Sequence, residues 1–228
     1  MIISLIVAIG LAVLFILVRL RQHPVFGLLS KTSASLGFVA MGVVAFLVAS
    51  PDKTLILMLF GAVLGLVGDM VLDLKYTHRK YYDQYLISGM GAFLLGHVVY
   101  FIGLTLYAKT LEAQLFWPIL ISAIAAPILA LIIIGGGKLL GLQFGRFFVP
   151  CLGYAFVLGF LAVYAFMLFL QMPVYLPFFI GLVLFMASDS LLSVQYFAGK
   201  DDNTTLTIIT HALYYAAQIS LMLGLFFA

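Results

Sequence analysis

Residues 54–74 read TLILMLFGAVLGLVGDMVLDL, and this stretch decides the class of the fold. It is free of charge until Asp69, and a second carboxylate, Asp73, stands near its end. A helix needs about 20 mostly apolar residues to cross the hydrocarbon core of a bilayer, so the stretch is long enough to span it. Gly61, Gly65, Asp69 and Asp73 follow one another at intervals of four and share one face of a helix. Because glycines at that spacing let helices approach closely, we expect this face to pack against protein rather than lipid.

The rest of the chain has the same apolar character. Of its 228 residues 65% are hydrophobic and 8% are charged, whereas a soluble domain carries about 25% charged residues. We therefore predict an all-α polytopic membrane protein that forms a single transmembrane domain over 1–228. Apolar runs between polar or Pro/Gly breaks predict eight transmembrane helices, at 2–18, 33–49, 54–74, 87–106, 115–134, 148–170, 174–193 and 206–227. The first run has no basic segment before it and no small-residue cleavage site after it, so we expect a retained helix rather than a signal peptide.

The distribution of basic residues predicts the orientation. The first, third, fifth and seventh loops and their borders hold nine Lys and Arg residues, and the even-numbered loops hold two. By the positive-inside rule the odd-numbered loops are cytoplasmic and both termini lie on the other side. We expect the bilayer to be a bacterial inner (plasma) membrane. The net charge of +3 is spread over short loops, which argues against nucleic-acid binding. The single cysteine, Cys151, excludes an internal disulfide, and the oligomeric state is left open.

Polar side chains inside the predicted spans or at their mouths are the candidate site residues, because an ionisable group in a membrane is costly and is usually kept for function. In the predicted topology they come from six helices and most lie towards the cytoplasmic side, with His97 close to mid-membrane. They are Lys31, Asp69, Asp73, His97, Tyr100, Tyr154, Asp189, Ser190, His211, Tyr214 and Gln218. A purely structural role, with the aspartates paired to Lys31 or to tyrosines between helices, is the alternative interpretation.

Two parts of the chain resemble each other. Residues 63–72 can be laid over 183–192 so that Asp69 coincides with Asp189, and a His-x-x-Tyr pattern follows in the next helix of each part. We expect a 4+4 parallel internal repeat, with halves 1–110 and 111–228. Four crossings in each half preserve the orientation, so the axis relating the halves runs along the membrane normal.

The chain also resembles a known family. Gly68-Asp69, the run from Phe93 to Tyr100, Ser188-Asp189-Ser190-Leu191-Leu192 and the run from Tyr214 to Gln218 look like motifs of the YhhN-like membrane proteins, which include lysoplasmalogenases. Lys31 resembles the lysine of that family at the start of its second helix, although Thr32 stands where proline is common. The resemblance spans nearly the whole chain. It implies eight helices and hydrolysis of the vinyl-ether bond of lysoplasmalogens, a lysophospholipid substrate, to a fatty aldehyde and a glycerophospho-base.

The polar residues suit that reaction. A vinyl ether hydrolyses through protonation of its β-carbon to an oxocarbenium ion, and two carboxylates serve a similar transition state in glycosidases. Asp69 and Asp189 are the expected acid/base pair, without an assignment of which is the acid. His97 and Tyr100, or Tyr214 and Gln218, could orient water or the departing oxygen. Lys31 is expected at the cytoplasmic rim, where it could hold the lysolipid phosphate, and Asp73 could join the site or cap its helix.

Two other classes of function use similar residues. A proton-coupled transporter also needs carboxylates at a repeat interface, but it is usually built from broken helices, and no predicted span has a central Pro-Gly break. A zinc-dependent membrane lipid hydrolase could use His97, His211 and an aspartate. Such sites usually show closely spaced histidines on one helix, which this sequence lacks. We therefore expect no metal and no cofactor.

Overall fold

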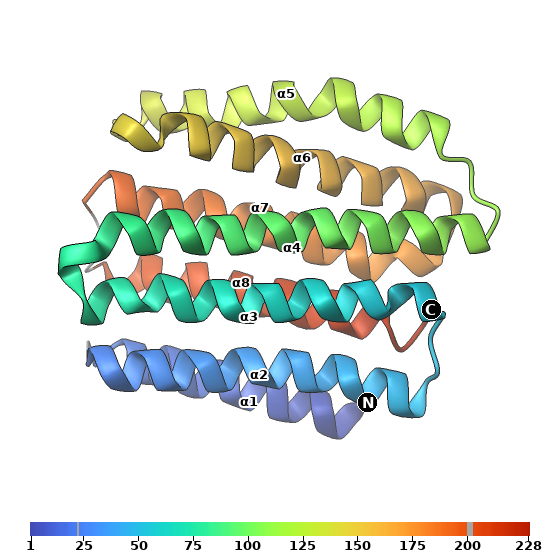
Figure 1. Ribbon diagram of the computed structural model, residues 1–228, viewed down its shortest axis with the longest axis horizontal. Helices are drawn as coiled ribbons and strands as arrows, with labels where there is room; N and C mark the ends of the chain where they lie inside the picture. The colour runs from blue at the N-terminus through green and yellow to red at the C-terminus, as the bar shows by residue number, and fades with distance from the viewer. Residues whose placement is uncertain (22, 200–202) are drawn as a thin grey trace.

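The computed structural model describes residues 1–21, 23–199 and 203–228, and in these residues it is an all-helical bundle. Its eight long helices lie side by side along one axis (Figure 1). They are α1 (Ile2–Arg19), α2 (Pro24–Val48), α3 (Ile56–Thr77), α4 (Tyr82–Thr110), α5 (Phe116–Leu139), α6 (Phe148–Gln171), α7 (Leu176–Phe197) and α8 (Thr204–Gly224). Short 3₁₀ turns precede four of them, namely η1 (Lys53–Leu55), η2 (Arg79–Tyr81), η3 (Gly145–Phe147) and η4 (Pro173–Tyr175).

The prediction of eight spans is confirmed, because each of the eight helices is long and apolar enough to cross a membrane. The start of α2 differs most from the prediction: it lies at Pro24 instead of residue 33. Pro24 is suited to the first helical position, where its missing N–H costs nothing. The following hydroxyl groups are satisfied within the helix, since Ser30 and Thr32 donate to the carbonyls of Phe26 and Leu28 at 2.7 and 2.9 Å. A polar stretch therefore continues the helix instead of ending it.

Consecutive helices are antiparallel, so the connections alternate between the two ends of the bundle. The α1–α2, α3–α4, α5–α6 and α7–α8 connections share one end, at the left of Figure 1, and we call it the odd-loop end. Both termini lie towards the opposite end. Lys200, which contributes to the charge count above, lies outside the described residues.

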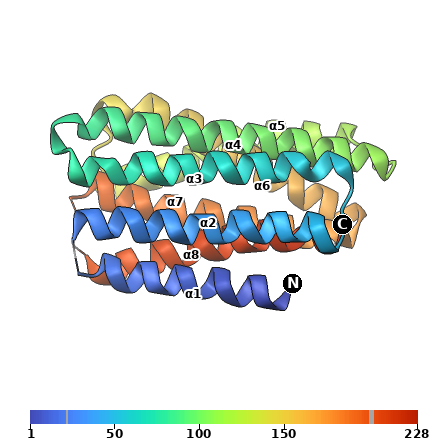
Figure 2. The ribbon, with the colours of Figure 1, turned by 60° about the horizontal axis from the view of Figure 1, so that its bottom comes forward.

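The helices pack as four hairpins, α1–α2, α3–α4, α5–α6 and α7–α8. Between hairpins, α2 packs on α3 and α8, and α6 packs on α7 and α4 (Figures 1 and 2). These are the pairs that a two-fold relation between the halves would generate, although the repeat itself stays a prediction. The correspondence is incomplete, and the largest difference is that α1 packs along α8, whereas α5 has no comparable contact with α4. The space beside α5 therefore differs from the space beside α1.

Glycines on α3 let side chains of neighbouring helices come close to it, and the predicted packing of this face against protein is confirmed. A Cβ on Gly61 would overlap the ring of Tyr100, and one on Gly65 would come within 2.9 Å of Nε2 of Gln218. Gly68 gives the same close approach to Phe93 on α4. This face of α3 is thus fully covered by protein, and it ends in Asp69 and Asp73, which are each 1% exposed.

Candidate active site

The two carboxylates of α3 lie in an ion-pair cluster with cations from α1 and α2. Lys31 Nζ is 3.2 Å from Asp69 Oδ1 and 3.3 Å from Asp73 Oδ1. The Arg19 guanidinium is bidentate to Asp73, with Nη1 3.0 Å from Oδ2 and Nη2 3.3 Å from Oδ1. A charge buried in an apolar medium is costly unless it is paired. Two cations face two carboxylates here, so the cluster is neutral when both aspartates are ionised.

The structure changes the expected position of Lys31. Because α2 begins at Pro24, Lys31 lies inside the helix rather than at its mouth, and it is 4% exposed. Its ammonium already contacts both aspartates, so it is not placed at the rim as a free cation for a phosphate. Asp73 lies one turn before Thr77, the last residue of α3, and belongs to the ion-pair cluster rather than capping the helix.

Hydroxyl groups complete the shell around Asp69. Ser35 Oγ and the Tyr214 hydroxyl both donate to Asp69 Oδ2 at 2.5 Å. Tyr214 in turn accepts a hydrogen bond from Gln218 Nε2 at 3.3 Å, and Gln218 Oε1 accepts one from Tyr100 at 3.1 Å. The chain of hydrogen bonds joins α3, α8 and α4, and Asp69 Oδ2 accepts two hydroxyl groups while Oδ1 contacts the cation.

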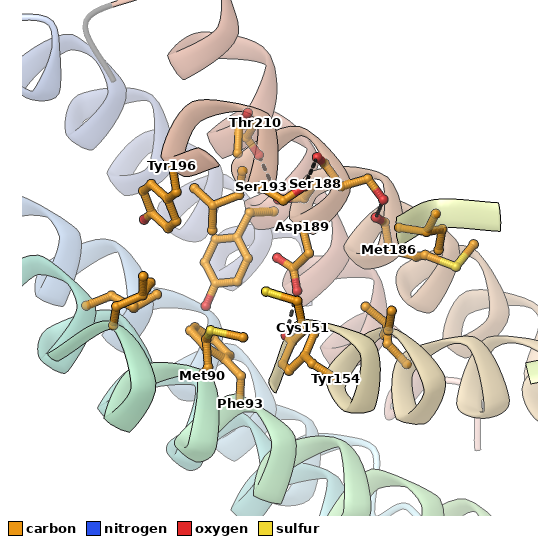
Figure 3. A pocket seen from close by; sticks show the side chains of 18 of the residues that line it. Met90, Phe93, Cys151, Tyr154, Met186, Ser188, Asp189, Ser193, Tyr196 and Thr210 are labelled. Carbon is orange, nitrogen blue, oxygen red and sulfur yellow. Dashed lines mark hydrogen bonds between the residues drawn. The ribbon is translucent and has the colours of Figure 1, made fainter. Parts of the chain in front are cut away.

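Asp189 has a simpler environment. It lies on α7 and accepts one short hydrogen bond, from the Tyr154 hydroxyl of α6 to Oδ2 at 2.5 Å. Among the described residues no Lys, Arg or His makes an ion pair with it. In Figure 3 the Asp189 carboxyl and the Tyr154 ring point toward each other, with Cys151 beside them. The two aspartates that the sequence alignment makes equivalent therefore have different partners.

Both aspartates line one cavity of about 100 Å³. Its polar lining also includes Lys31, Tyr154, Tyr214 and His211. The rest of the wall is mostly apolar and comes from α3 to α7, with Leu72, Leu86, Met90, Phe93, Ile133, Ile134, Leu158, Met186 and Phe197 among its residues. A group that enters this cavity meets two carboxyls of different character inside a largely apolar enclosure.

Comparison with known proteins gives the family. A sequence model of the YhhN family matches residues 26–225, which is most of the chain. The chain belongs to the YhhN family. The family includes lysoplasmalogenases. Neither the curated proteins nor the solved structures contain a match to the chain.

Four predicted site residues of this YhhN-family protein do not line the cavity. Asp73 lies in the ion-pair cluster, and Tyr100 is joined to Tyr214 through Gln218 by hydrogen bonds, as described above. His97 is 1% exposed and packs edge-on against Phe185 and Tyr154, with ring centroids 4.6 and 5.7 Å apart. Neither of its ring nitrogens makes a hydrogen bond of good geometry to a described residue, although the Phe93 carbonyl one turn earlier interacts with the ring. In this position the His97 ring supports the Tyr154 ring by packing against it.

Ser190 and His211 do line the cavity. The Ser190 hydroxyl donates to the Met186 carbonyl at 2.7 Å, so its hydrogen is used within α7. The His211 ring is in edge contact with Phe15 of α1 at 4.9 Å, which fixes its position in the wall.

Arg19 and Ser35 are site residues that the sequence analysis missed. Arg19 entered only the charge count, because it stands at the end of an apolar helix and nothing nearby in sequence pairs with it. Ser35 follows Lys31 by four residues, so it shares a helical face with that lysine, and this spacing is a signal that could have found it.

The geometry also bears on the two alternative functions. In the described residues no three His, Cys, Asp or Glu side chains are arranged to hold a metal ion. Helices α3 and α7 continue without a break through Asp69 and Asp189. The discontinuous helices typical of transporter sites are therefore not found at either aspartate.

Proposed function

We propose that this protein is a membrane-embedded hydrolase that cleaves the vinyl-ether bond of lysoplasmalogens to a fatty aldehyde and a glycerophospho-base. The observation that carries the proposal is the unequal pair of carboxyls on one apolar cavity. Asp69 is held by a cation and two hydroxyls, whereas Asp189 has a single tyrosine. Membership of a family that includes lysoplasmalogenases supports the same class of reaction.

The partners of the two carboxyls assign their roles. Asp69 is balanced by Lys31 and is the ionised member of the pair. An ionised Asp189 would leave a second carboxylate in an apolar enclosure without a cation, so the carboxyl of Asp189 carries a proton. Tyr154 donates to Oδ2, which leaves the second oxygen of Asp189 free to hold that proton. Asp189 is thus the acid.

The reaction then follows in three steps. Asp189 gives its proton to the β-carbon of the vinyl ether, and the resulting oxocarbenium ion faces the negative charge of Asp69. Water attacks the cationic carbon and its proton passes to the Asp189 carboxylate, which restores the acid. The hemiacetal collapses as its hydroxyl proton moves to the glycerol oxygen, which leaves with the electron pair of the broken C–O bond. Tyr154 stabilises the Asp189 carboxylate while it exists.

The apolar part of the cavity wall suits the hydrocarbon next to the vinyl ether. Leu86 and Met90 of α4 and Ile133 and Ile134 of α5 line it, at the place where α5 does not pack along α4. A single-chain lipid in the bilayer would reach the aspartates from this side. We further propose that the odd-loop end, with the site, faces the cytoplasm of a bacterial plasma membrane and that both termini lie outside it.

Purified protein incubated with a single-chain vinyl-ether glycerophosphoethanolamine tests this function. We expect free fatty aldehyde, and in heavy water we expect one deuterium on the carbon next to the aldehyde. In ¹⁸O-water the glycerol oxygen should stay unlabelled, because water attacks the oxocarbenium carbon. The saturated alkyl-ether analogue should bind without turnover, since it has no carbon to protonate.

Two results would overturn the proposal. Label in the glycerol oxygen would show attack on the other side of the ether. Cleavage of an ester lysolipid at a comparable rate would identify a general lysolipid hydrolase instead.

A further inference from the structure

A second pocket, of about 510 Å³, lies at the odd-loop end of the bundle, and we call it the basic pocket. Its lining comes from both ends of the α1–α2 and α3–α4 connections and from α7 and α8. The residues are Arg19, Leu20, His23, Pro24, Lys75, Tyr76, Arg79, Tyr82, Gln195, Thr204, Thr207 and His211. Three cations and two histidines are among them, and no described residue of the lining is an Asp or Glu. The pocket therefore attracts an anion.

Hydrogen-bond donors in this pocket remain available. Arg79 is exposed and makes no ion pair with a described residue. Arg19 uses two N–H groups for Asp73 and also interacts with the Tyr76 side chain, and a guanidinium has five N–H groups in all. Thr207 Oγ1 accepts from Gln195 Nε2 at 2.8 Å, so its own hydrogen is free to donate. Phosphate oxygens are commonly bound by the paired N–H groups of arginine together with hydroxyl donors.

The floor of the pocket is fixed by aromatic rings. The Arg19 guanidinium lies over the Tyr76 ring at 4.2 Å from the centroid. The Lys75 ammonium lies 3.1 Å from the centroid of the Tyr196 ring, and Lys75 is fully buried. Cations held in this way keep their positions when an anion binds, so little order has to be gained on binding.

The basic pocket and the cavity of the aspartates share a wall. His211 lines both of them. An anionic group in the basic pocket is thus separated by one side chain from a hydrocarbon group in the cavity, which is the arrangement of polar head and chain in a lysophospholipid. Lys31, the residue expected to hold the phosphate, is occupied by Asp69 and Asp73.

We propose that the basic pocket binds the phosphate of the substrate head group and that Arg79 and Arg19 are its main donors. This deepens the proposed function and rests on it for the identity of the bound lipid. The phosphate of a bilayer lipid has the same chemistry, and the experiment separates the two sources. The positive-inside rule would scatter cations over this end, but it does not require that they gather in one pocket that adjoins the cavity and whose described lining has no carboxylate.

Arg79→Gln tests the proposal, with Lys80→Gln as its matched control. Both residues are exposed neighbours in η2 and both changes remove one positive charge, but Lys80 does not line the pocket. In neutral detergent without added lipid, Arg79→Gln should raise KM for the vinyl-ether glycerophosphoethanolamine at least about tenfold, because one charge-assisted contact is lost, with little change in kcat. Lys80→Gln should leave both constants unchanged.

A phosphate-free substrate, the 1-O-alkenyl glycerol, provides the second arm. Its KM should be the same in the wild type and in Arg79→Gln. Equal effects of Arg79→Gln on both substrates, or equal effects of the two variants, would overturn the phosphate assignment. An effect of Arg79→Gln that appears only in nanodiscs containing phosphatidylglycerol would assign the pocket to a bilayer lipid and overturn the substrate assignment.

Binding of the alkyl-ether lysophospholipid keeps the proposal testable if no hydrolysis is found. Its Kd, measured by titration calorimetry in the same detergent, should rise at least about tenfold in Arg79→Gln and not in Lys80→Gln. Hydrolysis failing while this difference persists would refute the proposed function alone. An unchanged Kd would refute the basic pocket as the phosphate site.

Discussion

The charge balance of the buried cluster makes a prediction that does not depend on the substrate. Lys31→Met leaves Arg19 against two carboxylates, and Asp69→Asn leaves two cations against Asp73. Each change leaves one unit of charge in the cluster without a counter-charge. The cluster is buried, because Lys31, Asp69 and Asp73 are each 4% exposed or less. Removing one partner of a buried ion pair costs about 3–5 kcal/mol of unfolding free energy, so each variant should lose that much stability.

The double variant Lys31→Met/Asp69→Asn is the informative one. It retains the bidentate pair of Arg19 with Asp73 and has no net charge. The two single costs sum to about 6–10 kcal/mol, and we expect the double variant to lose at least about 2 kcal/mol less than the sum of the measured single costs. The Ser35 and Tyr214 hydroxyls can still donate to the amide oxygen that replaces the carboxylate, so those hydrogen bonds do not obscure the comparison.

Reversible unfolding in mixed micelles, followed by circular dichroism, measures these differences. Lys109→Met is the control, because Lys109 is exposed on α4 and away from the cluster, and it should change the unfolding free energy by less than about 0.5 kcal/mol. If the single costs add to within about 0.5 kcal/mol, Lys31 and Asp69 are not coupled. Charge balance would then give no reason for Asp69 to be ionised and Asp189 protonated.

The remaining predictions concern the site, the cavity, metal dependence and topology. Asp189→Asn should lower turnover at least about 10²-fold, the low end for general acid–base catalysis, with the unfolding free energy nearly unchanged because Tyr154 can donate to the amide; turnover close to wild type would refute the acid. Ala155→Leu, which fills the cavity, should lower kcat/KM at least about tenfold, since one misplaced methylene can cost that much, whereas Ala123→Leu on the exposed face of α5 should not. Activity should survive exhaustive chelation, and stoichiometric zinc lost together with activity would contradict this. A C-terminal reporter that works only in the cytoplasm should stay inactive; a signal from it would reverse the orientation.

The fold follows from features that sequence patterns carry well. Each helix is specified by a local apolar run, so the spans could be read one by one. A helix end predicted from the sequence is wrong where a polar side chain pairs with a residue of another helix. Lys31 looks like the end of a span in sequence, but its two carboxylates on α3 allow it to lie inside α2.

The candidate site was predictable in part for the same reason. Asp69 and Asp189 stand out because an aspartate in an apolar run is rare, and no information about packing is needed to find them. Arg19 lies 54 residues before the aspartate it pairs with, so only the bundle brings them together. The basic pocket is formed by several connections at one end of the bundle, so no local sequence pattern predicts it.

If the predicted halves are equivalent, the different environments of the two carboxyls correspond to single differences in sequence between them. Leu36-Gly37-Phe38 of α2 can also be laid over Leu152-Gly153-Tyr154 of α6, a weaker match at an offset of 116 residues. At that offset Lys31 corresponds to Phe147, so the cation beside Asp69 has an apolar counterpart.

The hydroxyl donors are exchanged in the same way. Ser35, which donates to Asp69, corresponds to Cys151, and Tyr154, which donates to Asp189, corresponds to Phe38. Tyr214 contacts Asp69, whereas its His-x-x-Tyr counterpart Tyr100 bonds Gln218 instead. Two equivalent aspartates would share one environment and compete for one role. Among the described residues only Asp69 has a cation beside it, and under the proposed mechanism this difference lets Asp189 keep its proton as the acid while Asp69 supplies the counter-charge.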